Sequence, residues 1–276
     1  MTPPPGGVSP AGLDYLNIHQ HWHVTAWQQT PVVVFDDERA VLTALWEAAH
    51  LGWLRQPPAL IRLDAHHDQW PLAAAREAAW REAVRRGDRR EVCLAVEFDV
   101  GCDDADWVRA AAAASMITDV VTFYVTELPD PPPLPGARSL LLGGLGAELE
   151  PGGALACAGR DGGAPPGDVP GWDAQTCRFG ADGLPYMLST DLDAFSSTTG
   201  NGRPRSWAAA DLEHELLAPR RRDRGTVRVA DVLRGAAAGA CLVTIAREPW
   251  YCGGDLEAAR LLKTLDEVVF DGGIQA

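Results

Sequence analysis

Lysine is almost missing from this sequence. Lys263 is the only lysine among the 24 basic residues, so nearly all of the positive charge is carried by arginine. The 38 acidic residues outnumber the basic ones and give a formal net charge of −14. Because phosphate backbones are bound by basic patches, this balance argues against nucleic acid as a partner. An acidic surface suits a cationic substrate or a basic peptide, although solubility alone also explains it.

Paired cysteines, a targeting segment and a membrane span are also missing. The six cysteines form no CxxC pair, which excludes a zinc-finger spacing and a small disulfide scaffold. No basic and apolar signal segment follows Met1, and no apolar run reaches membrane-spanning length. We therefore expect a soluble, cytoplasmic protein with reduced thiols, no membrane partner and an oligomeric state left open.

The length fits one large globular domain or two small ones, and because no clear second domain stands out along the chain we expect one. The 276 residues are 46% hydrophobic and 22% charged, an ordinary balance for a chain with a sizeable core. Residues 1–13 are rich in proline and glycine, and we expect them to be disordered. Residues 14–276 would form the domain. Within it, residues 143–176 are interpreted as a long loop or an insertion, either a lid over a site or a disordered insert.

Short apolar segments alternate with amphipathic ones along the chain. Strands are predicted at 31–35, 59–63, 92–98, 120–125, 139–142, 185–190 and 241–246. Helices are predicted at 41–49, 72–86, 107–116, 207–217, 229–238 and 256–269. Loops are predicted at 196–205 and 247–255, and a solvated helix end at 220–222. This alternation is typical of a three-layer α/β/α fold with a mostly parallel central sheet, whose sites form at the carboxyl ends of strands.

A candidate metal site follows the predicted strand 59–63. Asp64, His66 and Asp68 stand at alternating positions, and residues i, i+2 and i+4 of an extended chain point to the same side. Asp191 and Asp193 follow the strand 185–190 in the same way. Four carboxylates and one imidazole are more than one cation usually needs. The set fits two hard divalent cations such as manganese, roughly 3.5–4 Å apart. Aspartate-rich turns after strands are the alternative interpretation.

The alternating run of His19, His21 and His23 is a further candidate for metal binding. Such an HxHxH run can bind a metal. It also fits a strand edge whose polar side chains face water, and we favour that interpretation.

Segment 64–68 (Asp-Ala-His-His-Asp) resembles the Asp-Ala-His-x-Asp motif of the arginase and agmatinase (ureohydrolase) superfamily. Segment 191–193 (Asp-Leu-Asp) resembles the later Asp-x-Asp of that superfamily. A weaker likeness, from about His19 onward, is to the peptide arginases that modify ribosomally made peptides. The resemblance implies an arginase- or deacetylase-like fold and a domain of that kind over residues 14–276. It also implies two Mn²⁺ per chain and hydrolysis of arginine residues in a precursor peptide to ornithine and urea.

The resemblance implies five metal ligands: Asp64, His66, Asp68, Asp191 and Asp193. The sixth ligand of the superfamily is a histidine after the first strand, and Glu38 stands at that position here. Three alternatives follow: Glu38 coordinates, one metal is weakly held, or a histidine of residues 19–23 replaces it. We expect Glu38 to be the sixth ligand.

The implied mechanism is attack of a metal-bridging hydroxide on the guanidinium carbon. Asp68 would orient the hydroxide, and His67, His21 or His23 would transfer the proton to the leaving nitrogen. His67 alternates with His66, so it is also expected to point away from the metals.

A guanidinium substrate needs a carboxylate partner and profits from an aromatic face. Glu248, in the loop after the last strand, and Asp103 are the candidate carboxylates, and Asp103 fits a helix cap equally well. Trp250 is the candidate aromatic residue, although a tryptophan is more often part of the core.

Three other functions are weighed against the peptide arginase. A ureohydrolase acting on free arginine or agmatine would use the same metals. A degenerate relative that binds peptide without turnover is suggested only by the missing histidine. A zinc amide hydrolase of the deacetylase kind shares the general fold, but it keeps a single metal on one Asp-x-His and one further Asp, and the fuller ligand set argues against it.

Overall fold

The computed structural model describes residues 22–100, 105–123, 133–141, 185–198, 203–222 and 225–274. The predictions for residues 1–13, residues 143–176, His19, His21 and Asp103 lie outside these described residues. Among the helices of the described part, none is both long and apolar enough to cross a lipid bilayer.

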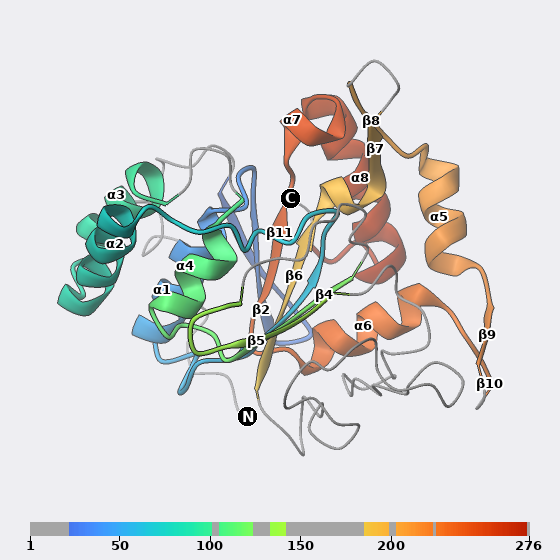
Figure 1. Ribbon diagram of the computed structural model, residues 1–276. Coiled ribbons are helices and arrows are strands. Elements are labelled where there is room, and N and C mark those ends of the chain that lie inside the picture. Colours follow the sequence, from blue (N-terminus) through green and yellow to red (C-terminus); the bar gives the residue numbers. More distant parts are fainter. Residues whose placement is uncertain are drawn as a thin grey trace.

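A seven-stranded sheet forms the centre of the described structure (Figure 1). Its strands are, in spatial order, β1 (His23–Trp27), β2 (Thr30–Phe35), β11 (Val243–Ala246), β6 (Tyr186–Asp191), β3 (Ala59–Leu63), β4 (Asp119–Phe123) and β5 (Arg138–Leu141). Only the β1–β2 pairing is antiparallel among these, and the other five are parallel. The predicted α/β class with a mostly parallel sheet is therefore confirmed.

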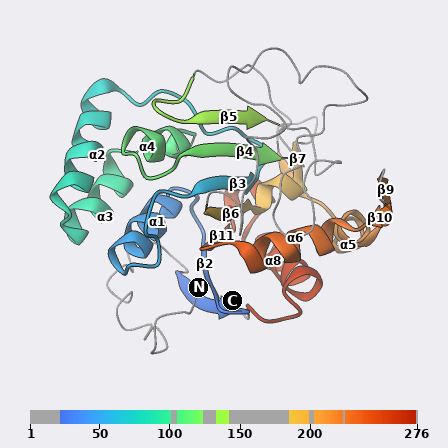
Figure 2. The same cartoon turned by 90° about the horizontal axis from the view of Figure 1, so that it is seen from below.

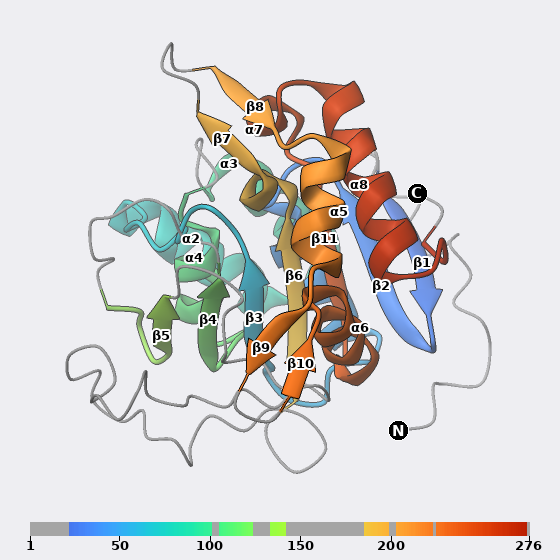
Figure 3. The ribbon, with the colours of Figure 1, turned by 90° about the vertical axis from the view of Figure 1, so that its right-hand side faces the viewer.

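Helices cover both faces of the sheet. One face carries α1 (Ala40–His50), α2 (Ala74–Arg86), α3 (Arg89–Phe98) and α4 (Trp107–Ala113), and the other carries α5 (Ala209–Leu217), α6 (Val229–Gly239) and α8 (Asp255–Val269). Figure 1 shows the two groups on either side of the strands, and Figure 3 shows the second group in front of them. Neighbouring residues of one strand face different cores, as Leu60 and Ile61 do. Burial on both faces explains why most residues of the central strands are apolar.

The order of the strands reverses at β3. The chain adds β4 and β5 on one side of β3, and then returns to place β6 on its other side (Figure 2). In open parallel sheets such a reversal leaves a crevice at the carboxyl ends of the strands, which is where ligands bind.

The predicted strand 92–98 is wrong, because this segment belongs to helix α3. The Asp88 side chain caps the helix by accepting a hydrogen bond from the Glu91 backbone N–H. The buried residues of the helix are Val92, Cys93, Ala95 and Val96. This spacing is helical, and the short apolar run did not distinguish it from a strand.

Three segments predicted as irregular or helical contain other elements. The loop 196–205 includes β7 (Ser196–Thr198), which pairs with β8 (Pro204–Ser206). The basic run forms β9 (Arg220–Arg222), which pairs with β10 (Gly225–Val227). The loop 247–255 includes the short helix α7 (Pro249–Cys252), which begins with a proline at its first position, where proline is well tolerated.

A glycine in α6 fixes how closely this helix approaches β6. A Cβ atom at Gly239 would lie 2.5 Å from the hydroxyl oxygen of Tyr186. That hydroxyl donates a 2.6 Å hydrogen bond to the Ala236 carbonyl, and burial raises the pKa of Tyr186 to about 12.

We predict that Gly239→Ala destabilises the protein by about 1–3 kcal/mol, the usual cost of overpacking. In the double variant with Tyr186→Phe the clashing oxygen is gone, and the nearest ring carbon lies at an ordinary 3.5 Å. Urea denaturation of the unaltered protein, the two single variants and the double variant gives the coupling energy between positions 186 and 239. Additive effects of the two substitutions would contradict the close contact.

Candidate metal centre

Four acidic segments meet at one edge of the sheet. The parallel register sets Phe35 beside Ala246, Ala246 beside Asp191, and Leu63 beside Thr190. The strands β2, β11, β6 and β3 therefore end at the same level, and the residues that follow them lie together. The expectation that the acidic motifs share the carboxyl edge of the sheet is confirmed.

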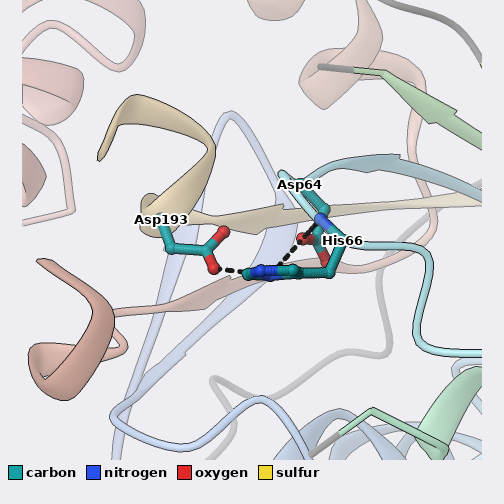
Figure 4. A group of neighbouring side chains, drawn as sticks. All are labelled: Asp64, His66 and Asp193. Carbon is teal, nitrogen blue, oxygen red and sulfur yellow. Dashed lines mark hydrogen bonds and ion pairs between the residues drawn. The ribbon is translucent and has the colours of Figure 1, made fainter. Parts of the chain in front are cut away.

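Asp64, His66 and Asp193 form the more open group of this edge (Figure 4). The His66 Nδ1 atom lies 2.8 Å from Asp193 Oδ2 and 3.7 Å from Asp64 Oδ1. The side chain of His66 is 35% exposed, whereas both carboxylates are buried. Figure 4 shows dashed lines from the His66 ring to both carboxylates. The group is therefore reached from solvent on the His66 side.

Backbone hydrogen bonds hold these carboxylates in place. Asp64 Oδ1 accepts a 2.6 Å bond from the His66 N–H, and Asp193 Oδ1 accepts a longer one from the Ala65 N–H. Asp191 Oδ1 accepts a 2.9 Å bond from the Asp193 N–H at the start of the 3₁₀ helix η4 (Leu192–Phe195). The turns after β3 and β6 thus fix the orientation of the side chains before any ligand binds.

A buried arginine occupies the other half of the acidic edge. Arg62 belongs to β3 and is 0% exposed. Its Nη2 lies 2.8 Å from Glu38 Oε1 and also forms ion pairs with Asp64 Oδ2 and Asp68 Oδ2. Its Nη1 donates a 2.9 Å hydrogen bond to the His67 carbonyl. Three carboxylates thus surround one guanidinium nitrogen.

The Trp107 ring packs against the Arg62 guanidinium in this half of the site. Its ring centroid lies 5.0 Å from Arg62 Cζ, within the range of a cation–π contact. Its Nε1–H donates a 2.7 Å bond to Glu38 Oε2 and a 3.3 Å bond to Asp68 Oδ2. The arrangement is fully buried and contains both faces of contact that an arginine prefers, a carboxylate fork and an aromatic ring.

Glu248 supports Glu38 through the backbone. Glu248 Oε1 accepts a 2.6 Å bond from the Glu38 N–H, and the Glu248 N–H donates to the Asp36 carbonyl. Glu248 (φ 41°) and Asp68 (φ 48°) both have left-handed backbone conformations, which are costly for residues other than glycine. Such strain is concentrated at functional sites, and here two strained residues line one site.

Buried negative charge dominates the electrostatics of the edge. Burial, and then the charges of Asp193 and Glu38, raise the pKa of Asp191 well above its ordinary value. Burial also raises the pKa of Glu38, against the opposing effect of Arg62. For Arg62, burial alone would lower the pKa, but the nearby carboxylates outweigh it and the pKa is raised. The carboxylates therefore hold more negative charge than Arg62 balances, which favours protons or added cations.

One divalent cation fits the open group. A cation about 2.1 Å from each ligand atom keeps neighbouring ligand atoms about 3.0–3.5 Å apart. The two distances from His66 Nδ1 lie just below and just above this range, at 2.8 and 3.7 Å. Shifts of a few tenths of an ångström would complete the coordination, so Asp64, His66 and Asp193 would hold the cation.

A second cation does not fit beside Arg62. Glu38, Asp64 and Asp191 each offer an oxygen within 4.8 Å of the others, as a metal site requires. The Arg62 Nη2 atom already contacts the oxygens of two of these residues. A cation bound there would overlap that nitrogen, and Arg62 would have to leave its buried position. Binding of the expected pair of cations would therefore require Arg62 to move, and the pair stays a prediction.

The structure brings together most of the residues that the sequence indicated. The six predicted metal ligands (Glu38, Asp64, His66, Asp68, Asp191 and Asp193) and Glu248 lie at the shared edge. His67 is buried, its Nδ1 accepts a bond from the Gln69 N–H, and its ring packs 5.0 Å from that of Trp70. Their roles as ligand, proton carrier and substrate contact stay predictions.

Two predicted residues lie at or beyond the rim of the site. Trp250 is 87% exposed on α7 and is not part of the core. Its neighbour Tyr251 places its ring 5.9 Å from that of His66. His23 is exposed on the edge strand β1, as expected for a strand edge that faces water.

Sequence reasoning missed Arg62 and Trp107. The signal for Arg62 was present, because a charged residue interrupts an otherwise apolar strand and a buried charge requires a partner. Trp107 was read only as part of a helix, and nothing local to it indicated a hydrogen bond to Glu38.

No protein-family model and no curated protein matches this sequence.

We predict that the metal-free protein becomes less stable as the pH rises. The pKa of Asp191 is raised in the folded protein above its ordinary value of 3.8. A carboxyl with a raised folded pKa stabilises the fold fully below its unfolded pKa and loses that contribution as the pH rises through the folded pKa. The melting temperature in EDTA should therefore fall as the pH rises from the ordinary pKa of 3.8 into the neutral range.

Addition of Mn²⁺ should restore the melting temperature at the upper end of this range, because a cation that binds only the folded state stabilises it. The same titration with NaCl at matched ionic strength serves as the control. A melting temperature that depends on neither pH nor Mn²⁺ would contradict the account of the acidic edge.

Proposed function

We propose that the protein is a metal-dependent hydrolase of carbon–nitrogen bonds. The observation that supports this most is the group of Asp64, His66 and Asp193, which is open to solvent only on the His66 side and backed by further buried carboxylates. Burying several carboxylates together is costly unless a cation is bound among them. Manganese is the proposed cation, because oxygen ligands outnumber nitrogen ligands here.

A divalent cation at this position would lower the pKa of water and supply a nucleophile at neutral pH. The chain itself contributes orientation and charge. Asp68 is held by Arg62 and by the Trp107 N–H, so the direction of its carboxylate is fixed. The backbone bonds to Asp64 and Asp193 preorganise the ligands and reduce the reorganisation that binding requires.

The proposed substrate group is the guanidinium of an arginine residue in a ribosomally made precursor peptide, with ornithine and urea as products. Two features support a cationic substrate. The acidic edge contains more buried carboxylates than Arg62 alone can pair with. The exposed Tyr251 ring on α7 lies 5.9 Å from the His66 ring, on the side of the site where a guanidinium can stack. Free arginine or agmatine would present the same group to the same site.

A specific observation favours a second candidate, hydrolysis of an amide by a single cation. Arg62 fills the position that a second cation would need, and one cation on Asp64, His66 and Asp193 matches the simpler Asp-x-His plus Asp ligand set of deacetylase-like hydrolases. The acidic surroundings do not exclude an acylated amine as the substrate.

Product analysis separates these reactions. The Mn²⁺-loaded protein is incubated with an arginine-containing peptide, free arginine, agmatine and an acetyl-lysine peptide, and urea and acetate are measured. Urea from the peptide in preference to the free compounds is expected. Urea mainly from free arginine or agmatine would replace the peptide proposal, and acetate alone would favour the amide reaction. If neither product is released, the chosen substrates are wrong, and metal binding has to be tested separately.

Trp250 provides a test of the proposed substrate path. We predict that Trp250→Ala raises KM for the arginine peptide about 2–5-fold with little change in kcat, because an exposed cation–π contact is worth about 0.5–1 kcal/mol. Its 87% exposure means that the free energy of unfolding should change by less than about 0.5 kcal/mol.

The matched control is Leu256→Ala, since Leu256 is an equally exposed apolar residue on α8. It should leave KM unchanged. Equal KM values for Trp250→Ala and the unaltered protein would remove Trp250 from the substrate path.

A further inference from the structure

Arg62 is an unusual residue for its place in the fold. It occupies the fourth position of β3, a strand whose five residues are all buried. Its side chain lies on the same face of the sheet as Leu60 and reaches the carboxyl edge beneath α1 and α4. A guanidinium stays protonated at any working pH, so a permanent positive charge is built into the acidic edge.

The contacts of Arg62 are those of a bound cation. The Nη2 atom is surrounded by oxygens of Glu38, Asp64 and Asp68, which are three of the six predicted metal ligands. The Nη1–His67 carbonyl bond and the Trp107 ring hold the guanidinium from its other sides. No part of the side chain is exposed, so exchange with solvent cations requires it to move out of the core.

Asp64 divides the acidic edge into two halves. Its Oδ1 atom faces the His66 side, where it accepts the backbone bond from His66. Its Oδ2 atom pairs with Arg62. In a site for two cations a carboxylate placed in this way would bridge them. Here the same carboxylate bridges the open metal position and a guanidinium.

We infer that the Arg62 guanidinium takes the place of a second cation, so that the centre binds one divalent cation per chain, on Asp64, His66 and Asp193. This inference rests on the proposed metal site and specifies how many ions it holds. Arg62 is a positioning residue: it fixes Asp64 and Asp68 through ion pairs, and it does not touch the substrate.

The inference also explains the carboxylate at position 38. A histidine there would set an imidazole against the Arg62 guanidinium, with no negative charge to balance it. Glu38 instead pairs with Arg62 through Oε1 and accepts the Trp107 N–H through Oε2. Glu38 is therefore the partner of Arg62, and its effect on the metal is indirect.

Manganese titration tests the inference directly. The metal-free, full-length protein is titrated with Mn²⁺ by calorimetry, and the bound metal is counted after gel filtration. One equivalent per chain is expected. His66→Ala should abolish this binding, whereas Glu38→Gln should keep one equivalent. Two equivalents in the unaltered protein, or loss of the single equivalent in Glu38→Gln but not in His66→Ala, would overturn the inference.

Variants of Arg62 test whether the guanidinium charge replaces a second divalent cation. Arg62→Met should bind a second Mn²⁺, whereas Arg62→Lys, which keeps a positive charge, should bind one. A folded Arg62→Met protein that still binds one equivalent would overturn the inference. If this variant does not fold, the electron paramagnetic resonance spectrum of the unaltered protein decides: isolated Mn²⁺ is expected, and an exchange-coupled pair would contradict it.

The outcomes distinguish this inference from the proposed function. If neither Mn²⁺ nor Zn²⁺ binds to the unaltered protein, the metal-dependent hydrolase itself is wrong. If two ions bind, the hydrolase proposal stands and only the role of Arg62 is refuted.

Discussion

The ion pairs between Arg62 and the carboxylates around it are the interaction on which the site depends. A buried charge is tolerated only when it is paired and hydrogen-bonded, and removing one partner of such a pair typically costs about 3–5 kcal/mol. Here the partners Glu38, Asp64 and Asp68 come from two different strand ends. The guanidinium therefore joins the segments after β2 and β3, and it holds Asp64 in a direction that leaves the carboxylate's other oxygen facing His66.

The topology of the sheet brings these acidic residues together. Parallel pairing of β2, β11, β6 and β3 ends the four strands at one level, and every one of the four is followed by an acidic residue within two positions. The cluster contains more buried carboxylates than Arg62 alone can pair with. This excess supports the proposal that a cation, and then a cationic substrate, binds on the open side near His66.

The sequence was sufficient to predict a mostly parallel sheet and the edge at which the acidic motifs gather. Continuous apolar strands, and acidic residues directly after them, follow from local patterns that burial on both faces imposes. The helix 89–98 was missed because its apolar spacing is ambiguous over so short a run and depends on the Asp88 cap. The division of the acidic edge was missed for another reason. Packing between segments far apart in the chain decides which carboxylates contact Arg62. The same packing places Trp107 against Arg62 and Glu38. Residues before 22 lie outside the described part, so the structure does not test the histidine run there.

The most direct test of this account is the position of the metal itself. A crystal of the protein grown with Mn²⁺ would be measured at the manganese absorption edge, and the anomalous difference map would locate each ion. The account predicts one peak per chain, among Asp64, His66 and Asp193, with the Arg62 side chain still in contact with Glu38. A peak among Glu38, Asp64 and Asp191, with Arg62 displaced from the site, would contradict it.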